Sequence, residues 1–140
     1  MTESRIIHLN QIGNHTILIR PDGTHEAKQW TEGRPDAHWL HQQVEGYIEP
    51  VPYWHSFIEN GKRLSCIAYC NEDGKREEKA YNHRATVAWD AALKRARTGD
   101  GMVIFPGGVG DLGDHLVGNV VLVIGDEWFM GKEEEEDDPA

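Results

Sequence analysis

The hydrophobic positions of this 140-residue chain recur with two different periods, and each period predicts one type of element. Short runs rich in β-branched and aromatic residues, bounded by turn residues, predict strands. These runs cover residues 5–9, 16–20, 47–58, 63–71, 102–105 and 117–124. Asn60 and Gly61 predict a tight hairpin turn between the third and fourth runs, Gly13 and Asn14 predict one between the first two, and residues 71–74 form a further turn.

Two segments have the three-to-four-residue hydrophobic spacing of an amphipathic helix, residues 35–46 and 83–97. Asp36 lies at the start of the first, and Gly46 supplies a C-terminal stop. Asn82 can cap the second, because its side-chain oxygen can accept a hydrogen bond from a backbone N–H of the first turn.

These elements predict an α+β fold: one compact domain over residues 1–131, with a mostly antiparallel sheet of five to six strands and two helices packed on it. Residues 132–140 follow as an acidic tail. The tail holds six of the carboxylates and one lysine, so the net charge of −10 becomes −5 without it. A run of like charges stays solvated, and we therefore expect the tail to be disordered.

The acidic balance excludes a general nucleic-acid binder, because such proteins need clustered lysine and arginine. It leaves open a basic protein partner, or an acidic surface that mimics nucleic acid. No segment approaches the roughly 18 to 20 apolar residues of a membrane span, and the N-terminus lacks the apolar core of a signal peptide. We therefore expect a soluble, cytoplasmic protein without membrane contact. The oligomeric state is left open.

Gly108, Gly110 and Gly113 have the G-x-G-x-x-G spacing of a dinucleotide loop. A phosphate cradle needs a helix after the glycines, but a β-branched run follows here. Asp111 and Asp114 would also repel a phosphate. We therefore interpret this loop as a connection between two strands.

No residue pattern indicates catalysis. The serines and cysteines lack a nucleophile elbow or a neighbouring base, and Cys66 and Cys70 are four apart on one strand, about 13 Å by the strand rise and too far for a disulfide. His38 and His41 could share a metal on the first helix, but a zinc site needs three or four ligands. We predict no catalytic residue, no metal site and no cofactor.

Aromatic residues are concentrated in the first half of the chain. Pro50 and Pro52 each remove a backbone donor, so the strand that contains them should be an irregular or exposed edge. Trp54 follows directly. We predict that Trp54 anchors a protein partner there, with packing in the core as the alternative.

The stretches VEGYIEPVPYW, CIAYCNEDGKREEKAYNHRAT and GDHLVGNVVLVIG follow one another in an order that resembles the DUF3846 family, over about residues 15–125. The matching positions run from Gly46 to Glu49, then Asn71, Glu72 and Gly74, then Asn82, Ala85 and Thr86, then Gly118, Val120, Val121 and Val123. These proteins are small, are encoded by bacteriophages and bacterial mobile elements, and have no established catalytic residues. The longer second helix and the glycine loop depart from the family pattern.

The resemblance implies a phage-type origin and a compact α+β domain. Our leading hypothesis is a non-enzymatic accessory protein that binds a host or bacterial defence protein. The alternative is a nucleotide or small-molecule binder, or a weak hydrolase. Its site would be a polar cluster of Tyr47, Asn71, Glu72 and Asn82 at the end of the sheet.

Overall fold

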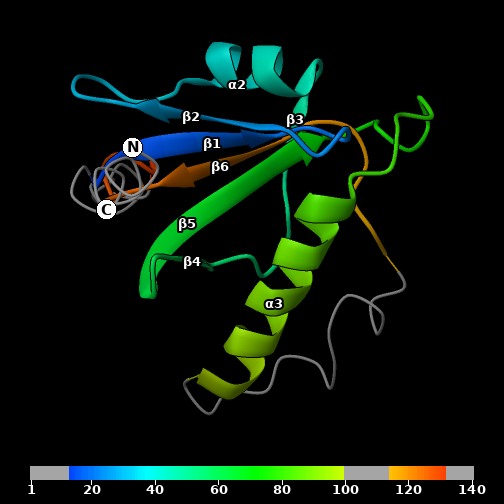
Figure 1. The fold of residues 1–140 in the computed structure, drawn as a ribbon. Coiled ribbons are helices and arrows are strands. Elements are labelled where there is room, and N and C mark those ends of the chain that lie inside the picture. Colours follow the sequence, from blue (N-terminus) through cyan, green and yellow to red (C-terminus); the bar gives the residue numbers. More distant parts are fainter. Residues whose placement is uncertain (1–12, 100–113, 132–140) are drawn as a thin grey trace, which may run out of the picture.

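The computed structural model describes residues 13–99 and 114–131, which form one α+β domain of six strands and two helices (Figure 1). The elements follow in the order β1 (His15–Ile19), β2 (His25–Gln29), α2 (Ala37–Val44), β3 (Ile48–Pro50), β4 (Ser56–Glu59), β5 (Lys62–Asn71), α3 (His83–Gly99) and β6 (Val120–Ile124). The predicted fold class is therefore confirmed.

The strands pair antiparallel in the spatial order β2-β1-β6-β5-β3, and β4 also pairs with β5. β1 and β6 lie inside the sheet, and all five residues of each are buried. Long apolar runs are typical of strands that are covered on both faces. Both edges of β1 are occupied, by β2 and β6. The predicted hairpin partner of residues 16–20, residues 5–9, lies outside the described residues.

β3 and β4 follow the same edge of β5 as one interrupted strand. The N–H of Val51 donates to the carbonyl of Ala68 over 2.8 Å, and that of Cys66 donates to the carbonyl of His55 over 3.1 Å. Residues 52–54 bulge out between these bonds. The predicted run 47–58 is thus an irregular edge, as its prolines indicate.

The predicted turn at Asn60 and Gly61 and the predicted cap at Asn82 are confirmed, and Asp36, predicted only to lie at the helix start, also acts as a cap. Asn60 and Gly61 both have positive φ, 54° and 77°, which is the conformation of a tight hairpin turn. Asp36 accepts the N–H of Trp39 over 2.8 Å, and Asn82 accepts that of Ala85 over 3.0 Å. These two bonds fix the starts of α2 and α3.

The end of α2 differs from the prediction in one residue. Glu45 takes the left-handed conformation with φ 64°, and Gly46 follows it. Gly46 is needed for another reason, since a Cβ there would lie 2.5 Å from the side-chain nitrogen of Asn71. Gly46 therefore marks the end of the helix as predicted, but glycine is needed there because the side chain of Asn71 comes too close for a Cβ.

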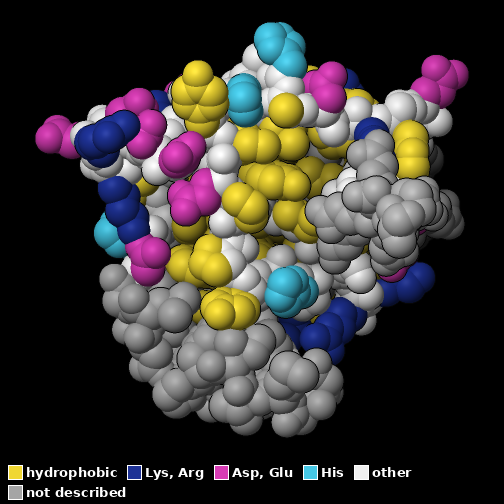
Figure 2. All heavy atoms as spheres, turned by 180° about the vertical axis from the view of Figure 1, so that it is seen from behind, with side chains coloured by type: hydrophobic (Ala, Val, Ile, Leu, Met, Phe, Trp, Pro, Cys, Tyr) yellow, Lys and Arg dark blue, Asp and Glu magenta, His cyan; other side chains and the backbone are white. Residues whose placement is uncertain are grey.

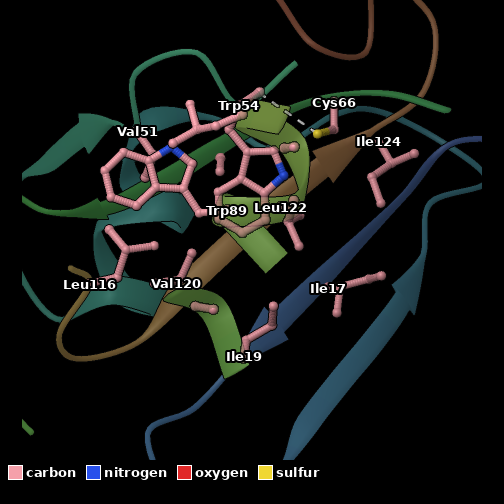
Figure 3. Packing of buried hydrophobic residues seen from close by; sticks show 14 residues of the cluster. Ile17, Ile19, Val51, Trp54, Cys66, Trp89, Leu116, Val120, Leu122 and Ile124 are labelled. Carbon is pink, nitrogen blue, oxygen red and sulfur yellow. Dashed lines mark hydrogen bonds between the residues drawn. The ribbon is translucent and has the colours of Figure 1, made fainter. Parts of the chain in front are cut away.

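The core has two parts, one on each face of the sheet, because alternate residues of a strand point to opposite sides. α3 covers one face, where Trp54 and Trp89 pack together over the strands (Figure 3). α2 lies on the other face with Leu40 and Val44 buried, and Phe129 folds back onto the same cluster.

One strand is absent from the predictions. β2, with the sequence HEAKQ, has five exposed residues and no apolar pattern, so periodicity gave no signal for it. β6 also begins three residues later than expected, and Val117 forms only an isolated bridge to Tyr81. The predicted strands 5–9 and 102–105, the glycine loop 107–113 and the acidic tail lie outside the described residues. In the described part, neither helix combines the length and apolar character of a membrane span.

Candidate functional site

A cleft of about 360 Å³ opens where β3, the end of β5, α3 and the segment 114–117 meet. Its inner wall is apolar and buried and includes Val51, Trp89 and Leu116. Its mouth carries charged and polar side chains. They are Glu49, Glu72, Asp73, Lys75, Arg76, Asp114 and His115. Small-molecule sites combine apolar walls with polar groups that orient the ligand, and in this cleft the polar groups predominate.

Asn71 builds one wall of this cleft. It is buried, and its side-chain NH₂ donates to the carbonyls of Val44 and Glu45 over 3.2 Å and 3.1 Å. Its side-chain oxygen accepts the N–H of Asp73 over 2.7 Å. The same side chain therefore satisfies orphan carbonyls at the end of α2 and sets the turn that follows β5.

The charges at the mouth are mostly paired. Lys75 forms an ion pair with Asp114, and Arg76 contacts Asp73 over 2.8 Å. The sequence places no cation near Asp114, so this pairing depends on the fold. Glu49 and Glu72 have no ion-pair partner in the described part of the chain and leave the mouth with excess negative charge.

Cys70 lines the cleft but is not a nucleophile at neutral pH. Burial raises the pKa of its thiol to about 11, and the carboxylate of Glu49 adds to the shift. The thiolate is the reactive form of cysteine, so this thiol stays protonated and inert. Neither Cys70 nor the fully buried Cys66 forms a disulfide.

The cleft brings together only two residues of the predicted polar cluster, Asn71 and Glu72. Tyr47 is adjacent through its carbonyl, which accepts the N–H of Glu72 over 2.9 Å. Its side chain, however, is 69% exposed and lies against His41 instead, with ring centroids 5.4 Å apart.

The side chain of Asn82 supports the fold and does not face the cleft. It is fully buried, and its side-chain NH₂ donates to the carbonyls of Ile19 and Gly118 over 2.9 Å and 2.8 Å. Its oxygen caps α3, so main-chain groups use its hydrogen-bonding capacity. Asn82 is not among the residues that line the cleft.

The prediction that Trp54 is an exposed anchor for a protein partner is wrong. Trp54 is 2% exposed because the bulge at residues 52–54 turns its indole inward, onto Trp89 (Figure 3). The indole N–H of Trp89 donates to the carbonyl of Pro52 over 2.9 Å and holds the bulge in place. Prolines correctly marked the irregular edge, but the aromatic side chain beside them belongs to the core.

Several residues of the cleft were not among the predicted site residues. Lys75 and Arg76 directly follow the predicted turn 71–74, so this turn was the available signal. Trp89 and Asp114 reach the cleft only through the packing of α3 and the segment after the glycine loop. Nothing local in the sequence places those two together.

The described residues contain no group of three histidine, cysteine or carboxylate side chains that could hold a metal ion. His38 and His41 both lie on α2, as predicted. No third ligand joins them within the described part of the chain.

Comparisons with protein-family models, with curated proteins and with solved structures found no match to this chain.

Proposed function

We propose that this chain is a non-enzymatic binding protein of the DUF3846 type that acts on a host or bacterial defence protein. The observation that carries this proposal is the sheet face on the side of α2, which residues 13–99 and 114–131 cover only in part. Figure 2 looks onto the face opposite α3, where hydrophobic side chains form a continuous area. Large exposed apolar patches are typical of protein interaction sites.

The half-buried residues Ile48, Ile67 and Tyr69 pack at the margin of the core on this face. A groove of about 310 Å³ adjoins them between α2 and the turn after β6. Leu40, Tyr69, Val123, Phe129 and Met130 contribute apolar side chains to it. The face therefore offers both apolar area and a groove that a complementary partner surface can fill, as protein interfaces require.

The charge of the chain indicates the kind of partner. With a net charge of −10, the protein attracts a surface whose rim is basic. We therefore infer a partner protein with an apolar centre and surrounding lysine or arginine. Its association with this chain should be slowed by salt.

The test compares two matched substitutions in affinity purification from host cells, with mass spectrometry as the readout. Ile67→Lys introduces a charge on the α2 face, and Val87→Lys introduces the same charge at a 53% exposed position of α3. One host protein should be retained by the wild type and the Val87 variant, and lost with the Ile67 variant. Thermal unfolding checks that both variants fold. In a binding assay with the purified host protein, the wild type and the Val87 variant should bind more tightly than the Ile67 variant.

The same proteins captured by all three chains would contradict this interface. No enriched host protein, combined with a thermal shift from a ligand panel, would favour the alternative function.

The alternative function is a nucleotide or small-molecule binder, or a weak hydrolase, and the cleft at Asn71 and Glu72 favours it. Its excess carboxylates fit a cationic or neutral ligand better than a triphosphate. A panel of amines, nucleosides and nucleotides in a thermal-shift assay tests this function. A hit should be weakened by Glu72→Gln and unaffected by Glu32→Gln, an exposed position outside the cleft.

A further inference from the structure

The outer edge of β2 differs from the opposite edge of the sheet. No described strand pairs with β2 on that side, and all five of its side chains are exposed. The opposite edge, formed by β3 and β4, is broken by a bulge and two prolines. Such devices block pairing with another chain. β2 is regular and contains neither proline nor glycine.

The hydrogen bonds of the β1–β2 ladder show which backbone groups of β2 face outward. Arg20 donates its N–H to Thr24 over 2.9 Å, and Trp30 donates to Asn14 over 3.1 Å. Bonded and non-bonded pairs alternate in an antiparallel ladder, so Glu26 and Lys28 bond inward to β1. The N–H and C=O groups of His25, Ala27 and Gln29 therefore point outward.

We propose that β2 pairs antiparallel with β2 of a second copy, about a two-fold axis at Ala27. In this register, His25, Ala27 and Gln29 lie opposite Gln29, Ala27 and His25 of the second copy. The outward backbone groups of the two strands then meet in bonded pairs. The two six-stranded sheets join into one, with an isologous interface.

The side chains of β2 are complementary in the same register. Glu26 lies opposite Lys28 of the second copy, and the two-fold axis repeats this pair. Both residues lie on the α2 face of β2, because their β1 partners are Leu18 and Thr16. Opposite charges across two strands stabilise the pairing. Ala27, the smallest side chain of β2, lies on the axis and allows close approach.

Neighbouring registers are disfavoured. A shift of the axis by one residue places Glu26 opposite Glu26, or Lys28 opposite Lys28, of the second copy. Like charges directly opposite one another destabilise a strand pair. The outward backbone groups can also pair in these neighbouring registers, so the charges of Glu26 and Lys28 select the register centred on Ala27.

The existing contacts of Glu26 and Lys28 leave both side chains available for pairing with the second copy. Glu26 binds Arg20 through one carboxylate oxygen, and its side chain is 64% exposed. The ammonium of Lys28 lies 4.5 Å from the ring centre of Trp30, on the α2 face. A pair of five-residue strands buries little area, so the dimer should form in a concentration-dependent way. This inference does not depend on the proposed function.

Sedimentation velocity of the full chain over a concentration series, at physiological ionic strength, tests the proposal. The wild type should shift from monomer to dimer. Glu26→Lys alone and Lys28→Glu alone should each weaken dimerisation by at least about tenfold, because two attractive pairs become repulsive. An equimolar mixture of these two variants should form a heterodimer, since every cross-strand pair is then of opposite charge.

Two further variants separate strand pairing from a general effect of charge. Ala27→Pro removes an N–H that points outward, so it should abolish the dimer and keep the β1–β2 ladder. Glu32→Lys changes charge at an exposed loop position outside β2 and should leave the dimer unchanged. Thermal unfolding verifies that every variant is folded.

Three results would overturn the proposal. One is a wild type that stays monomeric at all concentrations. Another is a dimer that folded Ala27→Pro retains. The third is a mixture of the two charge variants that associates no better than either alone.

Discussion

The two faces of the sheet are made by the same strands, yet in the described part of the chain one face is closed and the other is partly open. In β6, Val120, Leu122 and Ile124 face α3, whereas Val121 and Val123 face α2. All five are buried. The strand residues therefore do not explain the difference between the faces.

The helices explain it. α3 has 17 residues and contributes Trp89 and Leu93 to the core, and the bulge adds Trp54 beside them. α2 has eight residues, a length of about 12 Å, whereas the ten residues of β5 span about 33 Å. A helix of this length covers only part of the sheet. We therefore expect the α3 face to contribute more to stability than the α2 face, where Ile48, Ile67 and Tyr69 are only half-buried.

The largest expected effect is that of Trp89→Ala on the closed face. Trp89 is 1% exposed, packs against Trp54 and donates to Pro52. Removing its indole leaves a cavity and releases the bulge, so the free energy of unfolding should fall by about 3–5 kcal/mol. Chemical denaturation measures this change. A loss below about 1 kcal/mol would contradict the assignment of this face as the main core.

A somewhat smaller loss is expected from Asn82→Ala, at the start of α3. The substitution removes the N-cap and leaves the carbonyls of Ile19 and Gly118 buried without their donor. The free energy of unfolding should fall by about 2–3 kcal/mol. Asn119→Ala serves as the control, because Asn119 is half-buried and donates to a single carbonyl, that of Gln43, over 3.0 Å. Equal losses in the two variants would remove the special role given to Asn82.

The local elements of this fold could be predicted from the sequence, since their signals are local. Asp36 and Asn82 cap helices, and Asn60 and Gly61 form a turn, because each acts on a backbone within a few residues. β2 could not be predicted, because an exposed edge strand needs no apolar pattern.

The candidate site was only partly predictable. Asn71 and Glu72 were predicted as site residues from positions that match the DUF3846 resemblance, but the other walls of the cleft come from α3 and from the segment 114–117. Trp54 was misplaced because a proline-rich edge can bulge in either direction. Its burial depends on Trp89, 35 positions further along the chain.

Trp39→Ala also removes a tryptophan indole, as Trp89→Ala does, but on the partly open face. Trp39 is half-buried on α2 and packs edge-on against Trp30, with ring centroids 5.1 Å apart. Because part of this indole already contacts solvent, we expect a loss of only about 1–2 kcal/mol. Chemical denaturation beside Trp89→Ala gives the direct comparison of the faces. Equal losses from the two tryptophans would mean that the faces contribute equally to stability.

The smallest effect is expected from deletion of the acidic tail, residues 132–140. Its charges could stabilise the fold only by docking on cations, and the basic end of α3 is the main candidate. Lys94 already pairs with Asp90 over 3.0 Å, and the guanidinium of Arg95 donates to the side chain and carbonyl of Ser56 over 2.9 Å and 2.7 Å. The melting temperature should therefore change by less than about 2 °C. Deletion from residue 127 onward is the positive control, because it also removes the buried Phe129 and should lower the melting temperature strongly. A drop of more than a few degrees from the shorter deletion would mean that the tail docks on the folded domain and helps to stabilise it.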